Sequence, residues 1–345
     1  MLIALDAVGG DRAPREPVAG ALLATRELGL QVALVGPLEI LREELARHGP
    51  VPSGIELVAA GEAIGMDEAP VQAVRQKKDA SINVAMELVK QGTADAVVSA
   101  GNTGAVMTAA LLKLGRVRGI ERPAIGAMAP YNATGMLVLD VGANADCKPS
   151  YLEQFAQMGA VYMEQVFGVA NPRIGLLNIG EEAVKGNELA VEAYRRLERS
   201  GLNFVGNVEP DRFHHGPADV IVTDGFTGNV AVKVTEGVAD FLFSQLKTSI
   251  MSRLRYRLAA IVLRPALLEM RRHIDYGEYG GAPLLGVNGV VIIAHGRAEA
   301  QAMMNALRVA GEAASSGMLD AFRTLSAKSA EPVVPTASTS AGTTA

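Results

Sequence analysis

Short aliphatic runs alternate along this chain with longer segments of helical periodicity, and this alternation restricts the folds that the chain can adopt. Nine runs are predicted to be strands, at residues 2–5, 31–35, 55–58, 94–99, 124–128, 136–141, 174–178, 204–205 and 220–223. Helices are predicted between many of them, for example at residues 79–90, 105–114, 151–167 and 185–200. Strands that alternate with helices at this spacing form a doubly wound sheet that is mostly parallel. The predicted fold class is therefore α/β.

The composition supports this class of fold. Hydrophobic residues make up 49% of the chain, whereas aromatic residues are only 4% and tryptophan is absent, so the core is predicted to be aliphatic. Aliphatic strands are typical of parallel sheets, because helices cover both faces. One pair of runs, 124–128 and 136–141, is joined by the short segment "APYNATG" and is also compatible with a hairpin. In that case the sheet is mixed.

Charge and cysteine content exclude several classes of protein. The formal net charge of −5 argues against a general nucleic-acid-binding protein, which usually carries an excess of basic residues. Cys147 is the only cysteine, so an intramolecular disulfide or a cysteine-cluster metal site is excluded. The first residues lack the basic segment of a secretory signal, and no apolar run approaches the ~20 residues that cross a bilayer. We therefore expect a cytoplasmic protein.

One folded domain is predicted over residues 1–326. After Leu325 the sequence becomes rich in Pro, Ser, Thr and Ala and loses its periodicity, which is typical of disordered segments. Residues 327–345 are therefore predicted to form a disordered tail.

Polar, glycine-rich segments follow five of the predicted strands. They are "DAVGGD" at 6–11, "GNTG" at 101–104, "GANAD" at 142–146, "NIGEEAVKGN" at 178–187 and "DGFTGN" at 224–229. A glycine-rich turn between a strand and a helix directs backbone N–H groups toward a ligand and suits an anion. Because ligands of open α/β sheets bind beyond the carboxyl ends of the strands, we expect these loops to converge on one edge of the sheet. Asp6 and Asp11 are also compatible with a simpler role, as turn or helix-cap residues.

Several common catalytic signatures are missing. The sequence has no G-x-x-x-x-G-K-[ST] phosphate loop, no H-E-x-x-H, no G-x-S-x-G, and no G-x-G-x-x-G after a strand. Neither a nicotinamide cofactor nor a metal is therefore expected. His214 and His215 lie in "DRFHHGPAD", where an extended backbone would direct adjacent side chains to opposite sides, so a two-histidine metal site is not favoured. His295 follows the apolar run "VVIIA" and is a better site candidate, because it lies at a strand end.

Seven segments of the chain closely resemble the bacterial phosphate acyltransferase family. They are "ALDAVGGDRAP", "SAGNTGA", "RPAIGAM", "LDVGANADCKP", "LLNIGEEAVKGN", "DGFTGNVAVKVTEG" and "GGAPLLGVNGVVIIAHG", in this order from Ala4 to Gly296. Two departures are visible. Val8 stands where the family usually has Met, and Arg297-Ala298 stands where small hydroxyl residues usually follow the His-Gly pair. The second departure weakens any catalytic role for the residues just after His295.

The resemblance implies a three-layer α/β/α Rossmann-like fold, related to isopropylmalate dehydrogenases and phosphotransacetylases, and a homodimer. It also implies a reaction, the transfer of a long fatty acyl group from acyl carrier protein to inorganic phosphate, with no cofactor. The acyl phosphate would then be used by a membrane glycerol-3-phosphate acyltransferase, early in phospholipid synthesis. Acyl carrier protein and inorganic phosphate are thus the implied substrates.

This chemistry assigns roles to the loop residues. Phosphate must be held against the thioester carbonyl, and the oxyanion that forms must be stabilised. We predict Lys185 as the principal cation, with Asn187 and Asn229 as hydrogen-bond donors. Asp224 is predicted to orient Lys185 or a loop N–H. Substrate or phosphate binding is predicted for the remaining loop residues, which are Asp6, Gly9, Gly10, Asp11, Gly101, Asn102, Thr103, Gly142, Asn144, Gly186, Gly228 and His295.

A basic and apolar segment follows the last of these loops. Six arginines and two carboxylates lie between Arg253 and Asp275, and residues 258–263 are wholly apolar. The pattern predicts a helical arm over about 230–275 with its tip near Pro265, since proline ends or kinks a helix. Dimer packing, docking of the acidic carrier protein and peripheral contact with an anionic membrane are all compatible with it. The contact residues predicted for carrier or membrane are Arg253, Arg255, Arg257, Leu258, Ile261, Val262, Leu263 and Arg264.

Three other functions are compatible with parts of the sequence. A phosphotransacetylase-like enzyme that uses acyl-coenzyme A would need no basic apolar arm. A metal- and NAD-dependent decarboxylating dehydrogenase would need a cluster of aspartates, whereas these loops favour Asn and Gly. A non-catalytic scaffold that binds lipid or carrier would need neither Lys185 nor the polar loops. The acyltransferase is therefore the expected function.

Overall fold

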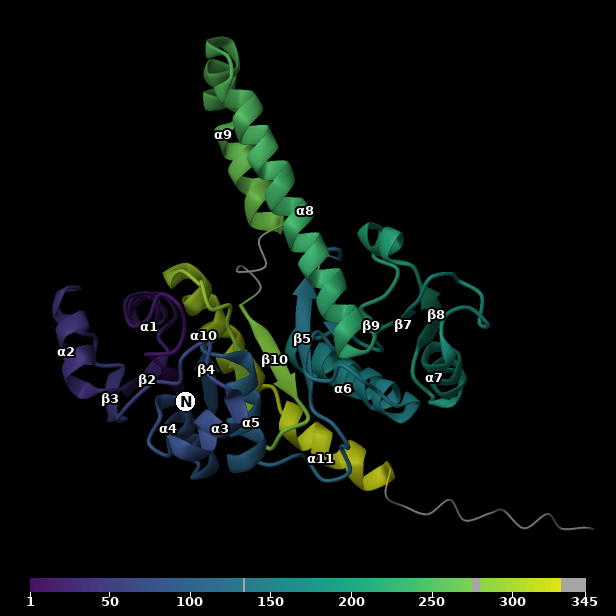
Figure 1. Cartoon of the computed structure of the whole chain (residues 1–345), viewed down its shortest axis with the longest axis horizontal. Helices are drawn as coiled ribbons and strands as arrows, with labels where there is room; N and C mark the ends of the chain where they lie inside the picture. Colours follow the sequence, from purple (N-terminus) through teal and green to yellow (C-terminus); the bar gives the residue numbers. More distant parts are fainter. Residues whose placement is uncertain (133, 275–279, 330–345) are drawn as a thin grey trace, which may run out of the picture.

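One sheet of eleven strands forms the centre of the molecule in this computed structural model, which describes residues 1–132, 134–274 and 280–329 (Figure 1). The strands are β1 (Leu2–Asp6), β2 (Gln31–Gly36), β3 (Ile55–Ala59), β4 (Ala96–Ser99), β5 (Ala124–Ala129), β6 (Met136–Leu139), β7 (Ile174–Leu177), β8 (Phe204–Val208), β9 (Val220–Val222), β10 (Ala282–Leu285) and β11 (Val290–Ile293). Their order is β3-β2-β1-β4-β11-β10-β5-β6-β9-β7-β8. All nine predicted strands are present. Two strands are not among the nine. They are β10, whose four residues include Pro283, and β11, of which the sequence analysis inferred only a strand end before His295.

The direction of the strands reverses near the centre of the sheet. The neighbouring pairs β11–β10, β10–β5 and β5–β6 are antiparallel, which confirms the hairpin interpretation of β5 and β6. The other pairs are parallel. After three reversals, β6, β7, β8 and β9 run opposite to β1, β2, β3, β4 and β11. The carboxyl ends of these two groups of strands therefore lie at opposite edges of the sheet.

Helices cover both faces of the sheet and give three layers, as the resemblance implies (Figure 1). One face carries α1 (Arg15–Leu28), α2 (Leu38–Ala46), α6 (Pro149–Phe167), α7 (Glu188–Arg199), α10 (Ala300–Ser315) and α11 (Met318–Ser329). The other face carries α3 (Pro70–Gln76), α4 (Ser81–Lys90), α5 (Thr103–Lys113) and the 3₁₀ helix η1 (Pro210–His215). Within β1, Ile3 and Leu5 pack toward the first layer and Ala4 toward the second. This alternation buries the strand on both sides, as expected of a doubly covered sheet.

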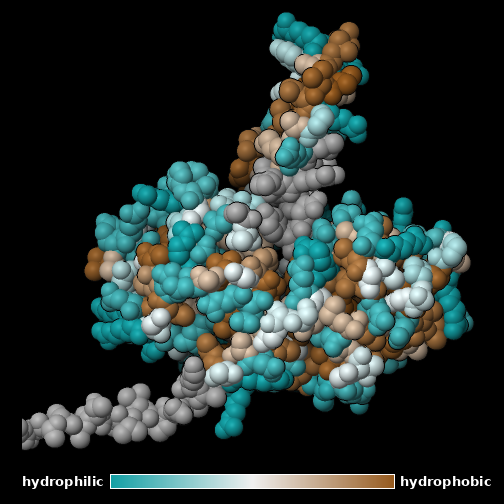
Figure 2. Space-filling view, turned by 180° about the vertical axis from the view of Figure 1, so that it is seen from behind, coloured by the Kyte–Doolittle hydropathy of each residue, from teal (hydrophilic) through white to brown (hydrophobic). Residues whose placement is uncertain are grey.

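The helices α8 (Gly225–Met251) and α9 (Leu254–Ile274) form an arm that projects from the body of the molecule (Figure 1). Of the α8 residues, Gly225 and Gly228 alone are buried, so the arm packs on the body only at its base. The connection at residues 252–253 is the tip. The predicted tip near Pro265 is wrong, since Pro265 lies inside α9. Proline removes only one helical hydrogen bond, and this exposed helix continues through it. Figure 2 shows hydrophobic residues gathered along the outer half of the arm.

The last described helix, α11, ends at Ser329, so helical structure continues three residues beyond the predicted domain end at 326. The rest of the predicted tail, residues 330–345, lies outside the described residues.

Candidate functional site

The loops after β1, β4 and β11 form a first loop cluster, defined by residues 6–11, 99–103 and 295–297. These three strands are neighbours, and Asp6, Ser99 and Ile293 lie side by side in the register. The loops are also joined to one another, because the Asp11 N–H donates to the Gly296 carbonyl over 2.8 Å. Gly10 has a φ of +106°, and a Cβ there would lie 2.9 Å from the Ala100 carbonyl oxygen. Only glycine permits this close approach of the loops.

Asp6 lies at the floor of the first loop cluster and is only 3% exposed. Its Oδ2 accepts a hydrogen bond of 2.7 Å from the Ser99 hydroxyl, whose oxygen accepts one of 3.0 Å from the Gly101 N–H. Its Oδ1 has no hydrogen-bond partner of good geometry among the described residues. Burial raises the pKa of Asp6, and the nearby Ser81 and Ser99 hydroxyls and Val8 and Gly9 N–H groups lower it in part. The site thus holds a buried carboxyl with spare hydrogen-bonding capacity.

The other residues predicted in this cluster differ in their exposure and in the hydrogen bonds that they already form. The Asn102 side chain caps α5 by accepting from the Ala105 N–H over 3.1 Å, and it donates to the Met66 and Glu68 carbonyls. Asn102 therefore has a structural role already. Thr103, Asp11 and His295 are exposed, and the His295 Nδ1 accepts from the Arg297 N–H over 3.1 Å.

The loops after β6, β7 and β9 form a second loop cluster, defined by residues 140–146, 178–187 and 224–229. Asp140, which is fully buried, organises the first of these loops. Its Oδ1 accepts hydrogen bonds from the N–H groups of Ile125, Gly142 and Ala143, at 3.0–3.2 Å. Its Oδ2 accepts from the Asn144 N–H over 2.7 Å and from the Asn144 side chain over 2.9 Å. Burial raises the pKa of Asp140, and these hydrogen bonds lower it in part.

The base of α8 packs directly on this loop. The Gly225 N–H donates to the Asn144 carbonyl over 2.8 Å, and a Cβ at Gly228 would lie 2.0 Å from the Asp140 carbonyl oxygen. Gly228 is therefore required for the close approach of helix and loop. Asp224 caps α8, since it accepts from the Thr227 N–H and hydroxyl, each over 2.8 Å. Asp224 was predicted to orient either Lys185 or a loop N–H. The bond that it accepts from the Thr227 N–H is of the second kind.

Asn229 and Lys185 expose their side chains in the second loop cluster. Asn229 lies on the first turns of α8, beside Gly142. Lys185 is half exposed, and the Glu182 carboxylate is 4.0 Å from its ammonium group. The buried Asn178 side chain donates to the Lys185 carbonyl over 3.0 Å and so fixes the backbone at this position.

The segment 185–187 is a loop and not the first turn of a helix, contrary to the prediction of a helix over 185–200. The helix α7 begins at Glu188, because the Asn187 side chain caps it by accepting from the Ala190 N–H over 2.9 Å. The amide NH₂ of Asn187 lies outside this cap, and Gly186 precedes it in an exposed turn. The predicted donor role of Asn187 therefore concerns that NH₂ group.

We expected the five loops to converge on one edge of the sheet, and this prediction is wrong. They form two clusters, at the opposite carboxyl ends of β1, β4 and β11 and of β6, β7 and β9. The expectation assumed a parallel sheet, and β10 with the β5–β6 hairpin reverses the direction between the two groups. The structure thus separates Lys185, Asn187, Asp224 and Asn229 from Asp6 and Gly101.

Asp140 is the organising residue that the sequence analysis missed. The signal was present, because "LDVG" at 139–142 follows a buried strand as "LDAVGG" does at 5–10. In both segments an aspartate directly follows the last apolar strand residue and precedes a glycine turn.

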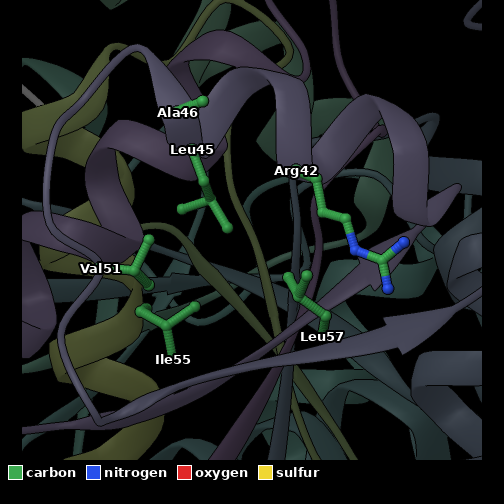
Figure 3. Close-up of a pocket in the computed structure, with 6 residues that line it drawn as sticks. All are labelled: Arg42, Leu45, Ala46, Val51, Ile55 and Leu57. Carbon is green, nitrogen blue, oxygen red and sulfur yellow. The ribbon is translucent and has the colours of Figure 1, made fainter.

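Two shallow pockets lie outside the loops. One of about 390 Å³ is lined by Arg42, Leu45, Ala46, Val51, Ile55 and Leu57, between α2 and the edge strand β3 (Figure 3). It contains no loop residue and is mainly apolar. The other, of about 380 Å³, is lined by Leu111, Arg116, Glu121, Arg122, Pro123 and Tyr151, and its Pro123 carbonyl accepts from the Asn144 side chain over 2.8 Å. It therefore adjoins the second loop cluster.

Within the described ranges, no three His, Cys, Asp or Glu side chains gather closely enough to hold a metal ion. The His214 and His215 rings lie 3.9 Å apart in η1, so the expected extended backbone at this pair is wrong. Burial raises the pKa of Cys147 to about 12, which keeps this thiol protonated. None of the described helices is long and apolar enough to cross a membrane.

Known proteins resemble this chain over nearly its whole length. The sequence pattern of one family, described as "Fatty acid synthesis protein", matches residues 1–320. A phosphate acyltransferase of Heliobacterium modesticaldum is 51% identical, over 96% of this chain and 100% of its own. A phosphate acyltransferase of Dictyoglomus turgidum is 53% identical, over 90% of this chain and 93% of its own. The match covers both loop clusters.

Solved structures confirm the fold class. A phosphotransacetylase from Streptococcus pyogenes matches with a TM-score of 0.60 and 18% identity, over 91% of this chain and 94% of its own. A 4-hydroxythreonine-4-phosphate dehydrogenase from Klebsiella pneumoniae matches with a TM-score of 0.54 and 15% identity, over 91% of this chain and 99% of its own. At these identities the likeness concerns the fold alone. With relatives above 50% identity over nine-tenths of its length, the chain belongs to the fatty acid synthesis protein family, together with these phosphate acyltransferases.

Proposed function

We propose that this enzyme transfers a long fatty acyl group from acyl carrier protein to inorganic phosphate, and that the second loop cluster carries the reaction. Family membership supports the reaction class. The observation that carries the choice of site is the half-exposed Lys185 ammonium, which lies on a loop held by the buried Asn178. Among the described residues, its one salt-bridge partner is Glu182, at 4.0 Å. The acyl phosphate would supply glycerol-3-phosphate acylation in phospholipid synthesis.

The reaction needs positioning and charge stabilisation more than a protein nucleophile. A phosphate oxygen attacks the thioester carbonyl carbon, the C–S bond breaks, and the carrier thiolate leaves with the electron pair and takes up a proton. Holding the two reactants together can contribute about 7 kcal/mol or more to the rate acceleration. Each well-placed donor to the oxyanion contributes about 3 kcal/mol. Lys185 would neutralise phosphate or oxyanion, and the amide groups of Asn187 and Asn229 would donate hydrogen bonds.

The supporting residues hold this arrangement in place. Asp224 fixes the first turn of α8, directly before Asn229, and Asp140 fixes the loop beside it. The first loop cluster, with Asp6, Gly101 and His295, stays a predicted second binding region for substrate or phosphate.

The decisive experiment measures release of free carrier thiol from palmitoyl-loaded carrier protein, with and without phosphate. We expect release that depends on phosphate and yields palmitoyl phosphate. The same assay with palmitoyl-coenzyme A separates the two donors. Faster turnover of the coenzyme A ester would favour the phosphotransacetylase-like alternative, and no turnover of either donor would contradict the proposed reaction.

A homodimer is proposed from the arm. Phe226, Val230, Val234 and Val238 recur every four residues along α8, so they share one face of this helix, and they are 48–66% exposed. A continuous apolar stripe of this length is typical of a protein–protein interface. We expect Val230→Glu with Val234→Glu to convert a dimer to a monomer in sedimentation velocity experiments.

Peripheral membrane contact is proposed for the outer arm. Leu258, Ile261, Val262 and Leu263 are 56–80% exposed on α9, close to the basic tip. Each aliphatic side chain buried in lipid contributes about 1.5–3 kcal/mol, which gives a reversible anchor. Ile261→Glu with Leu263→Glu should abolish cosedimentation with anionic vesicles and leave the dimer intact. If this variant still binds vesicles but becomes monomeric, the outer arm is an interface between subunits.

A further inference from the structure

Four cations lie on the two segments that contribute to the second pocket, residues 116–123 and 148–151, and two of them, Arg116 and Arg122, line it. Arg116, Arg118, Arg122 and Lys148, here called the basic collar, are all exposed. In the part of the chain that the structure describes, none of them forms a salt bridge, whereas the neighbouring Lys113 and Arg196 pair with Glu87 and Glu153. The whole chain carries a net charge of −5, so the basic collar is, like the arm, a local excess of positive charge.

Two members of the basic collar lie against the aromatic ring of the pocket. The Arg122 guanidinium carbon and the Lys148 ammonium each lie 5.9 Å from the centre of the Tyr151 ring, although the two cations come from different segments. Arg116 lines the same pocket, where one of its N–H groups donates to the Glu121 carbonyl. Glu121 contributes the single carboxylate of the lining, so an anion would meet an excess of cations there.

This pocket is connected to the second loop cluster by two hydrogen bonds. Its Pro123 carbonyl accepts from the Asn144 side chain, and the Asn144 carbonyl accepts from the N–H of Gly225, the first residue of α8. The basic collar therefore lies at the same edge of the sheet as Asn229 and Lys185. The arm tip is far away, because the 27 residues of α8 extend over about 40 Å from this base.

We propose that the basic collar is the docking surface for the acidic carrier domain, and that its pocket takes the phosphate group of the carrier's prosthetic arm. This inference rests on the proposed function. Arginine suits both carboxylates and phosphates because its N–H groups bind in a bidentate fork. The apolar side of the pocket, formed by Leu111 and Tyr151, would accept the carbon chain beyond the phosphate. The arm arginines, about 40 Å from the reacting loops, are left for membrane contact.

The test reverses charge in the basic collar and compares two acyl donors. Arg118→Glu with Arg122→Glu should raise the KM for palmitoyl-loaded carrier at least 10-fold. The KM for the palmitoyl thioester of N-acetylcysteamine, which lacks both carrier and phosphate, should change less than 2-fold. Arg42→Glu with Arg75→Glu makes the same change of charge at two exposed arginines elsewhere and should leave both values near wild type. Raising the salt concentration should weaken carrier use by the wild-type enzyme and affect the collar variant less.

Direct binding of the unacylated carrier separates this proposal from the proposed function. Titration should show binding to the wild type that the collar variant loses at least 10-fold. Equal binding by both proteins would overturn the docking surface, as would a larger effect from Arg253→Glu with Arg255→Glu on the arm. If the wild type binds carrier but turns over no acylated carrier, the proposed function fails and the docking surface stands. If it binds no carrier, the docking proposal fails.

Discussion

Two buried aspartates, one in each loop cluster, have equivalent positions in the sequence but different hydrogen bonds. Asp6 and Asp140 each follow the last apolar residue of a strand and precede a glycine turn. Asp140 accepts hydrogen bonds from four backbone N–H groups and one side-chain amide, so it joins β5 to the loop, and Asn144 of this loop accepts from the Gly225 N–H at the base of α8. Asp6 accepts from the Ser99 hydroxyl on one oxygen, and the other oxygen has no partner of good geometry among the described residues.

The difference indicates two kinds of loop. The Asp140 carboxylate is saturated, so it acts as a scaffold that holds the donors of neighbouring residues in fixed directions. The Asp6 carboxyl keeps capacity for another donor in a buried position, where an unmet acceptor costs free energy. We infer that the second loop cluster is organised before substrate binds and that the first still has a donor to gain.

The largest expected effect tests which cluster carries the chemistry. Lys185→Ala should lower the turnover number of acyl transfer about 100-fold, which corresponds to ~2.7 kcal/mol, because it removes one partner of phosphate or oxyanion. The circular dichroism spectrum and melting temperature should stay near wild type, since the Lys185 side chain is half exposed. Steady-state rates with palmitoyl-loaded carrier provide the measurement.

Two further variants make this comparison decisive. Lys233→Ala removes another exposed lysine of the same half, which pairs with Glu236 at 2.7 Å, and serves as the matched control. Asp11→Ala probes the exposed mouth of the first loop cluster. A larger loss of rate at Asp11 than at Lys185 would move the reaction to the first cluster.

The sequence allows the elements to be predicted but not their arrangement. Strand–helix periodicity is a local property, so nine strands and the hairpin after Ala129 could be recognised from composition and spacing. The direction of the second group of strands depends on β10, which is short, contains Pro283 and is followed directly by another strand rather than by a helix. The two loop clusters could therefore not be told apart from the chain alone.

Within the site, the polar residue types indicated where loop residues lie better than they indicated what each side chain does. Asn102 and Asp224 were predicted in loops and Asn187 where a loop and a helix prediction overlapped, yet each caps a helix, and the cap uses a side-chain oxygen. Helix caps and ligand-binding residues share the same polar side chains, so sequence does not separate them. The spare amide hydrogens of Asn187 became apparent only from the cap geometry.

The next prediction compares the two buried aspartates by the free energy of unfolding of their asparagine variants. Asp140→Asn should lower the free energy of unfolding by about 2 kcal/mol, because one oxygen becomes an NH₂ group that faces N–H donors. Asp6→Asn should cost less than about 1 kcal/mol, because the new NH₂ group can replace the oxygen that has no partner. Urea denaturation of both variants at pH 7 measures the difference. Equal losses would show that both carboxylates are equally saturated in solution.

The smallest effect concerns a third aspartate, whose pKa shifts in the opposite direction. Asp219 is 12% exposed at its side chain and accepts from the backbone N–H and the guanidinium of Arg173. Burial raises its pKa, but the hydrogen bonds from Arg173 outweigh this and leave the pKa below its ordinary value. For Asp6 and Asp140 the effect of burial is larger than that of the hydrogen bonds, so their pKa values lie above the ordinary value.

These signs predict opposite dependences of stability on pH. The contribution of Asp219 is complete above its ordinary pKa, about 4, and is lost as the pH falls through the lower value of the folded state. Asp219→Asn should therefore cost about 1 kcal/mol at pH 7 and at pH 5, and progressively less below about pH 4.

For a carboxyl whose pKa is raised, the folded state is favoured most at low pH and loses that advantage as the pH rises. The penalty of Asp6→Asn should accordingly shrink or reverse between about pH 4 and pH 7, and urea denaturation series at each pH would show the two opposite slopes. Parallel slopes for both variants would mean that the Arg173 pair does not control the ionisation of Asp219.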